Sequence, residues 1–194
     1  MGRTRAALSG LVCAFVATAT PAAAFTAIDP LTRQPLSTVE ESFRAQASPV
    51  PRQVVSFSGR YAPGTIVVST SERRLWYVLG NGQAVQYGVG VGRPGFTWAG
   101  THSITMKREW PDWRPPAAML RRRPDLPRYM KGGPDNPLGA RALYIGSTIY
   151  RIHGSNEPET IGEAVSSGCI RMTNEDVVDL YNRAKVGARV VVLR

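Results

Sequence analysis

The chain has 194 residues, of which 43% are hydrophobic and 20% are charged, and its formal net charge at pH 7 is +10. That length is enough for one domain with a hydrophobic core. The positive charge is carried by scattered arginines without a recognisable nucleic-acid-binding motif, so we exclude nucleic acid as the partner.

The N-terminus has the pattern of a secretory signal. Arg3 and Arg5 precede an apolar stretch over residues 6–20, and Ala22–Ala24 supplies a small-residue cleavage site. The apolar run is short for a bilayer span, so we expect residues 1–24 to be removed together with Cys13; an uncleaved anchor is the alternative. An exported basic protein meets the anionic polymers of the cell envelope.

The following segment, residues 25–58, is rich in proline and polar residues without a sustained period, and we interpret it as a flexible linker. Beyond it, short apolar and β-branched runs predict strands. These runs cover residues 64–69, 74–79, 84–91, 101–106, 142–145, 148–152 and 187–193. The dipeptide Asn81-Gly82 between two runs predicts a hairpin, because both residues tolerate a positive φ.

One helix is evident near the C-terminus. Thr173 can cap it, and Val177, Leu180, Tyr181 and Ala184 follow at the spacing of one apolar helix face. Several short strands with one or two helices predict a mainly β fold, either a sandwich or a barrel.

Residues 107–140 differ in composition from the rest. They contain seven of the fifteen prolines, two of the four tryptophans and the basic cluster Arg121-Arg122-Arg123. A long loop of this kind in a compact domain is usually functional, and the tryptophans favour a lid. The alternative is a solvated excursion stiffened by proline.

Cys169 would be the only cysteine left after removal of the signal, and an exported protein rarely keeps an unpaired thiol without a reason. A buried, inert cysteine is the alternative to a nucleophile. Arg171, the predicted helix N-terminus and a histidine would each lower the pKa of the thiol. His153, sixteen residues upstream, can accept the thiol proton. Gly168 allows backbone N–H groups to approach an oxyanion.

The other histidine and the glycine pattern argue against a metal or cofactor site. His102 lies in a strand-like stretch without catalytic neighbours, and we expect it to be structural. One mature cysteine and two separated histidines fall short of a zinc site, so we expect no metal. Gly88, Gly90 and Gly92 alternate with valines in a strand and do not open a helix, so no dinucleotide site or other cofactor is predicted.

The motifs around these residues resemble the signature of L,D-transpeptidases with a YkuD-type catalytic domain. They are Ile-His-Gly-Ser-Asn at 152–156, Ile-Gly at 161–162 and Ser-Ser-Gly-Cys-Ile-Arg-Met at 166–172. The resemblance implies a YkuD-like β-sandwich or barrel over residues 59–194. It also implies a peptidoglycan substrate whose stem tetrapeptide is attacked by a cysteine before the terminal D-alanine. Transfer to an amine of another stem would give a 3→3 cross-link.

By position, the resemblance makes Cys169 the nucleophile and His153 the general base, and it assigns Gly168 and the Cys169 amide to the oxyanion hole. The family most often has histidine where this chain has Ser167. The remaining assignments are support of the site by Ser167 and Gly154, and substrate binding by Arg171, Ser155 and Asn156. Arg171 could instead be an ion-pair partner, and Tyr144 and Tyr150 are within possible reach of the site.

Three alternatives to transpeptidation are open at this point. Water as the acceptor would make the protein an L,D-carboxypeptidase, and an envelope protein as the acceptor would make it an anchoring enzyme. A non-catalytic peptidoglycan-binding module is the third, against which the pairing of Cys169 with His153 argues. We expect a monomer located in the periplasm.

Overall fold

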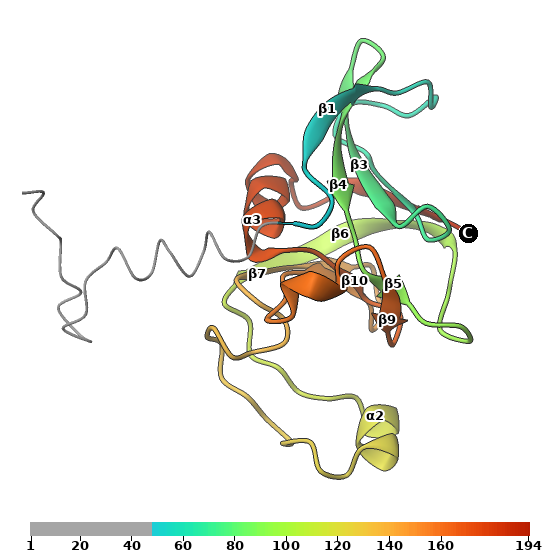
Figure 1. The fold of residues 1–194 in the computed structure, drawn as a ribbon. Helices are drawn as coiled ribbons and strands as arrows, with labels where there is room; N and C mark the ends of the chain where they lie inside the picture. The colour runs from blue at the N-terminus through green and yellow to red at the C-terminus, as the bar shows by residue number, and fades with distance from the viewer. Residues whose placement is uncertain (1–47) are drawn as a thin grey trace, which may run out of the picture. The chain divides into compact units, whose positions relative to one another are not determined.

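The computed structural model describes residues 48–194, so the expected signal segment and most of the expected linker lie outside the described residues. The described part is mainly β, as predicted (Figure 1). Nine strands form one sheet in the order β1-β4-β3-β2-β11-β6-β7-β8-β10, and β5 pairs with β9 in a second, two-stranded sheet. No helix within residues 48–194 has the length and apolar character needed to cross a membrane.

The strands are short, apart from the ten-residue β6. They are β1 (Gln53–Ser56), β2 (Ile66–Ser69), β3 (Arg74–Gly80), β4 (Gln83–Gly88), β5 (Val91–Gly92), β6 (Gly100–Glu109), β7 (Arg141–Ile145), β8 (Arg151–His153), β9 (Ala164–Ser166), β10 (Ile170–Arg171) and β11 (Arg189–Leu193). Two α-helices, α2 (Ala117–Arg122) and α3 (Asn174–Arg183), and the 3₁₀ turn η1 (Pro158–Thr160) complete the described elements.

Strand β6 links the two halves of the large sheet. Its first residues, Gly100–Ser103, pair with β11, whereas Ile104–Glu109 pair with β7. The register shifts between Ile104 and Met106, and such an irregularity bends a strand. The half that carries β7, β8 and β10 can therefore turn away from the half that carries β2, β3 and β4.

The main core contains the inward-facing valines, leucines and isoleucines of both halves, together with the apolar face of α3. Val177 and Leu180 of α3 are fully buried. Thr173 caps this helix by accepting a hydrogen bond from the Asp176 amide, which confirms the predicted cap. The helix packs against β7 and β8, and it thereby supports the strand that carries His153.

The sequence predicted the hairpin correctly but not every strand boundary. Asn81 and Gly82 connect β3 to β4 with φ angles of 49° and 70°, as expected. Strand β1 lies inside the range predicted as linker, because its pairing with the distant β4 orders it. Residues 148–150 form a turn and not a strand, since the Thr148 hydroxyl donates to the Ile145 carbonyl at 2.6 Å.

The proline-rich segment leaves the sheet after β6 and returns to it at β7. We call residues 110–140 the lid excursion; Figure 1 shows α2 at its far end. Its two legs are joined by a β-bridge between Trp113 and Met130. The buried Asn136 holds the base, because its amide donates to the carbonyls of Pro111, Met130 and Lys131 and accepts from the Leu138 amide. The excursion is thus an ordered structure.

Candidate active site

The parallel pairing of β8 with β10 determines which side chains share a face. Ile152 lies opposite Ile170, and both are completely buried in the core. Because side chains alternate along a strand, the neighbours of these isoleucines point to the other side of the sheet. His153 therefore faces the same side as Cys169, although sixteen residues separate them in the chain.

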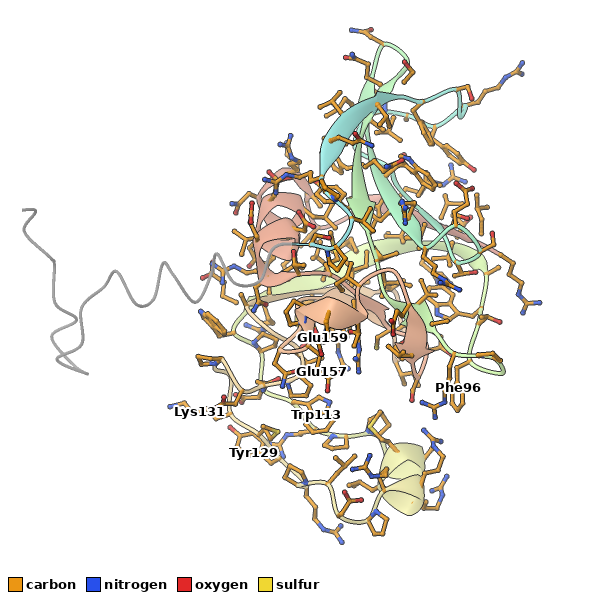
Figure 2. All side chains as sticks on the ribbon, in the orientation of Figure 1. Phe96, Trp113, Tyr129, Lys131, Glu157 and Glu159 are labelled. Atoms are coloured by element: carbon orange, nitrogen blue, oxygen red, sulfur yellow. The ribbon has the colours of Figure 1, made fainter. Side chains whose placement is uncertain are left out.

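This face opens into a cavity of about 480 Å³ between the sheet and the lid excursion. The sheet side of the cavity includes Arg151, His153, Cys169 and Arg171. The lid side is largely apolar and includes Trp113, Met119, Leu126, Pro127 and Met130. Trp113 of the lid excursion and Glu157 both line this cavity, and both are labelled in Figure 2.

His153 is held in one tautomer. Its side chain is buried, and Nδ1 lies 2.6 Å from the Gly154 carbonyl oxygen. A carbonyl can only accept, so Nδ1 carries the hydrogen and the lone pair of Nε2 is available as a base. Burial lowers the pKa of His153 to about 3, and the charges of Arg171 and Arg151 act in the same direction. The imidazole is therefore neutral at physiological pH.

Burial also determines the direction in which the pKa of the Cys169 thiol is shifted. It raises the pKa of Cys169 above its ordinary value, while a hydrogen bond from the Arg151 backbone and the charges of Arg151 and Arg171 oppose that rise. The expectation of a lowered pKa was therefore wrong in direction. The nearby cations are present, but the loss of solvent around the thiol outweighs them.

Gly168 shapes the turn that presents Cys169. Its φ of +108° is unfavourable for other residues, and a Cβ there would lie 2.4 Å from Tyr150 Cε1. Its carbonyl accepts a 2.7 Å hydrogen bond from Trp98 Nε1, and its amide donates to the Ser166 hydroxyl. That hydroxyl donates in turn to the Cys169 carbonyl at 2.7 Å. Because Ser166 occupies the Gly168 amide, this N–H is not available to an oxyanion.

Three of the other predicted residues line the cavity. Ser167 does so without a hydrogen-bond partner among residues 48–194. The side chain of Asn156 donates to the Asp135 carbonyl of the lid excursion at 3.2 Å. Arg171 forms a 2.8 Å ion pair with Glu157, which favours the ion-pair alternative raised for this residue.

The remaining predicted residues support the site from outside the cavity. Ser155 is buried and accepts the Glu157 amide, so it shapes a turn and does not reach the cavity. Gly154 provides the carbonyl for His153, and a Cβ at Gly154 would collide with Asn174 Oδ1. Tyr144 lies beneath the Arg151 guanidinium, whose central carbon is 5.0 Å from the ring centre.

Aromatic residues behind the turn were not predicted to act together. Tyr150 lines the cavity and stacks on Trp98 with the ring centres 4.6 Å apart. His102 meets the edge of Trp98 at 5.8 Å and does not line the cavity, in agreement with a structural role. Trp98 and His102 come from the loop before β6 and from β6 itself, so no local motif could have linked them to Gly168.

Two further residues that support the site were not predicted from the sequence. Asn174 Oδ1 accepts the Ala140 amide and so ties α3 to the start of β7. Asn136, at the base of the lid excursion, was likewise given no role from the sequence. Among residues 48–194 no three His, Cys, Asp or Glu side chains gather as metal ligands would.

Comparison with known proteins places the chain in a family. Residues 63–192 match the model of the L,D-transpeptidase catalytic domain, YkuD. The chain therefore belongs to the L,D-transpeptidase family. The match covers most of the described strands together with Cys169, His153 and the lid excursion.

One curated relative agrees with this assignment over part of its own length. ErfK/SrfK of Escherichia coli K12, a probable L,D-transpeptidase, is 38% identical over 66% of this chain and 43% of its own length. The chain thus spans less than half of that relative. A solved protein from Brucella melitensis, described as a probable carnitine operon oxidoreductase, is 46% identical over 74% of this chain and 93% of that chain, with a TM-score of 0.50.

A more distant solved structure shares the fold. The L,D-transpeptidase from Mycobacterium smegmatis is 18% identical and has a TM-score of 0.56, over 69% of this chain and 59% of that chain. At this identity the likeness concerns the backbone arrangement alone.

Proposed function

We propose that the protein is a peptidoglycan L,D-transpeptidase in which Cys169 is the nucleophile and His153 the proton acceptor and donor. One observation carries the proposal: paired strands present both side chains on one face, at a cavity large enough for a peptide. The free Nε2 of His153 gives this pair a base in the required tautomer. Family membership supplies the reaction class.

In the proposed acylation, His153 Nε2 takes the Sγ proton as Sγ attacks the carbonyl carbon before the terminal D-alanine. The resulting tetrahedral intermediate collapses when the C–N bond breaks, and the imidazolium gives its proton to the departing amine. The products are a thioester on Cys169 and free D-alanine. Transfer follows the reverse order, with the amine of a second stem as nucleophile and the cysteine sulfur as leaving group.

Two groups are suited to stabilise the oxyanion. The Cys169 amide forms no hydrogen bond with any of residues 48–194, whereas the Gly168 amide donates to Ser166. We therefore assign the oxyanion to the Cys169 amide and not to that of Gly168. The hydroxyl of Ser167 lines the cavity and could donate a second hydrogen bond, at the position where the family more often has histidine.

The cavity walls fit an anionic peptide. Arg93, Arg122, Arg123, Arg151 and Arg171 contribute to its lining, against the single acidic pair Asp135 and Glu157. A peptidoglycan stem carries several carboxylates, so the excess of arginine would favour its binding. A periplasmic location follows from the expected signal, and an envelope protein or water as the acceptor is the rival outcome of the test below.

The test is incubation of the purified protein with disaccharide-tetrapeptide, followed by mass analysis of the products. Cross-linked dimers are expected, and Cys169→Ala should abolish them. Tripeptides without dimers would indicate carboxypeptidase action, and an unchanged substrate would contradict the proposal.

His153→Ala tests the assigned base. We expect it to slow acylation of Cys169 by a carbapenem about 10²–10⁴-fold, the usual contribution of a positioned base. The adduct is read as an intact-mass shift over time. His102→Ala is the matched control, because that imidazole lies outside the cavity, and an equal loss in the two variants would refute the assignment.

A further inference from the structure

Arg151 is distinguished among the arginines of the cavity lining by the burial of its Nε. No described carboxylate pairs with it, and its buried Nε has no hydrogen-bond partner within residues 48–194. A buried donor without a partner is costly and is rarely kept in a folded protein without a function. The side chain lines the cavity, so a bound molecule could supply an acceptor to the terminal N–H groups of the guanidinium, whereas Nε itself is buried.

The other cavity arginines have compensating contacts. Arg171 pairs with Glu157 at 2.8 Å, and Arg123 pairs with Asp125 at 2.6 Å. Arg93 and Arg122 both lie over the ring of Phe96, at 4.4 and 5.1 Å. Arg151 also rests on an aromatic ring, that of Tyr144, but this contact uses the face of the guanidinium and leaves its N–H groups free.

The position of Arg151 beside the nucleophile limits what it can bind. Its backbone hydrogen-bonds the Cys169 thiol, and its charge acts on both Cys169 and His153. An acceptor that reaches the guanidinium from the cavity can therefore belong to a peptide whose carbonyl lies at Cys169. In a peptide, the α-carboxylate of the next residue is three bonds from that carbonyl carbon, or about 4 Å away.

We infer that Arg151 is a specificity-determining residue that binds the α-carboxylate of the departing terminal residue through a paired, charge-assisted hydrogen bond. The inference rests on the proposed function and assigns one subsite to it. The ring of Tyr144 fixes the plane of the guanidinium, so its fork is oriented before the substrate binds. The site would then select peptides that end one residue after the attacked carbonyl.

Equilibrium binding separates this inference from catalysis. The full-length Cys169→Ala protein is titrated with two tetrapeptides that differ only in a free or an amidated C-terminus. We expect the free acid to bind about 10- to 100-fold more tightly, the ratio given by a hydrogen bond to a charged group. Adding Arg151→Gln should bring the two affinities together, and Arg151→Lys should restore part of the difference.

Arg171→Gln in the same background is the matched control, because it removes a cation from the same sheet face whose charge Glu157 already balances. It should retain most of the preference for the acid. Equal affinity of the Cys169→Ala protein for both peptides, no binding of either, or an equal loss in both arginine variants would overturn the inference.

Turnover by the unaltered protein reports on the proposed function separately. Cross-linking without any preference for the free acid would leave that function standing and overturn the role of Arg151. A preference in binding without turnover would leave Arg151 as a carboxylate-binding residue and overturn the proposed function.

Discussion

The thiol of Cys169 and the imidazole of His153 are both held in their neutral forms by burial. The pKa of the cysteine lies above its ordinary value and that of the histidine falls to about 3. A resting thiolate–imidazolium pair is therefore disfavoured in the free protein. In the proposed mechanism the proton moves to Nε2 as the sulfur attacks, and the bound substrate completes the exclusion of water.

Gly168→Ala tests the turn behind the nucleophile. The substitution combines an unfavourable positive φ with a collision against Tyr150, so we expect the free energy of unfolding to fall by about 3 kcal/mol or more. Carbapenem acylation of Cys169 should slow as well. Urea unfolding and intact-mass analysis would measure the two effects.

Gly82→Ala is the control for this prediction. Its φ is also positive, at +70°, but an added Cβ would meet nothing within 4 Å. It should cost only about 1–2 kcal/mol, the penalty of the backbone conformation itself. A similar cost for both variants would show that the contact with Tyr150 is unimportant.

At the scale of whole elements, the order of the lid excursion depends on the side chain of Asn136. This amide joins the two legs of the excursion at their base through three backbone carbonyls. The long segment is ordered without a hydrophobic core of its own because these hydrogen bonds, and the bridge between Trp113 and Met130, replace a regular sheet.

Asn136→Ala should loosen the excursion and spare the sheet. Loss of the amide leaves the Pro111 carbonyl without its buried donor, at a cost of about 1–3 kcal/mol. We expect faster hydrogen exchange in residues 110–138 and a raised KM for the tetrapeptide with a smaller effect on kcat. Asp125→Ala, which breaks an exposed ion pair in the same excursion, should change neither quantity. Unchanged exchange in Asn136→Ala would contradict the assigned role.

Across the whole molecule, the N-terminal part of the described chain is fastened to α3 by charge. Arg52 lies within 3.4–3.7 Å of Glu175, Asp176 and Asp179. Burial raises the pKa of Asp176 to about 6 even so, because desolvation exceeds the attraction of Arg52. Its Oδ2 is buried without a hydrogen-bond partner among the described residues.

The carboxyl group of Asp176 makes the fold less stable as pH rises. Between its ordinary pKa of 3.8 and the folded value of about 6, the folded state binds more protons than the unfolded state, so stability falls with increasing pH. His153 acts in the opposite sense. Its folded pKa of about 3 lies below the ordinary 6.5, so stability rises with pH between those values.

Asp176→Asn should remove the first contribution and keep the second. Its Tm should exceed that of the unaltered protein by an amount that grows from pH 4 to pH 6 and then levels off. Thermal unfolding across this range would measure the difference. Asp179→Asn is the control, because the pKa of Asp179 is lowered and its loss should decrease Tm above pH 4. A constant Tm difference for Asp176→Asn would contradict the shift.

The sequence by itself determined the elements with local signals. The Asn81-Gly82 hairpin, the Thr173 cap and the apolar face of α3 depend on neighbours a few residues apart, and each was predicted correctly. The motifs around Cys169 and His153 were also sufficient to indicate the family. Strand β1 was missed because only its long-range pairing with β4 makes it a strand.

Only the tertiary structure decided the electrostatics and the partners within the site. The rise in the pKa of Cys169, the turn-forming role of Ser155 and the engaged amide of Gly168 depend on contacts and solvent exclusion made by the folded chain. Arg151 was one arginine among many until the structure put it beside Cys169 without an acidic partner. The physical reason is that desolvation and hydrogen-bond pairing act over distances in space, whereas a sequence motif records distances along the chain.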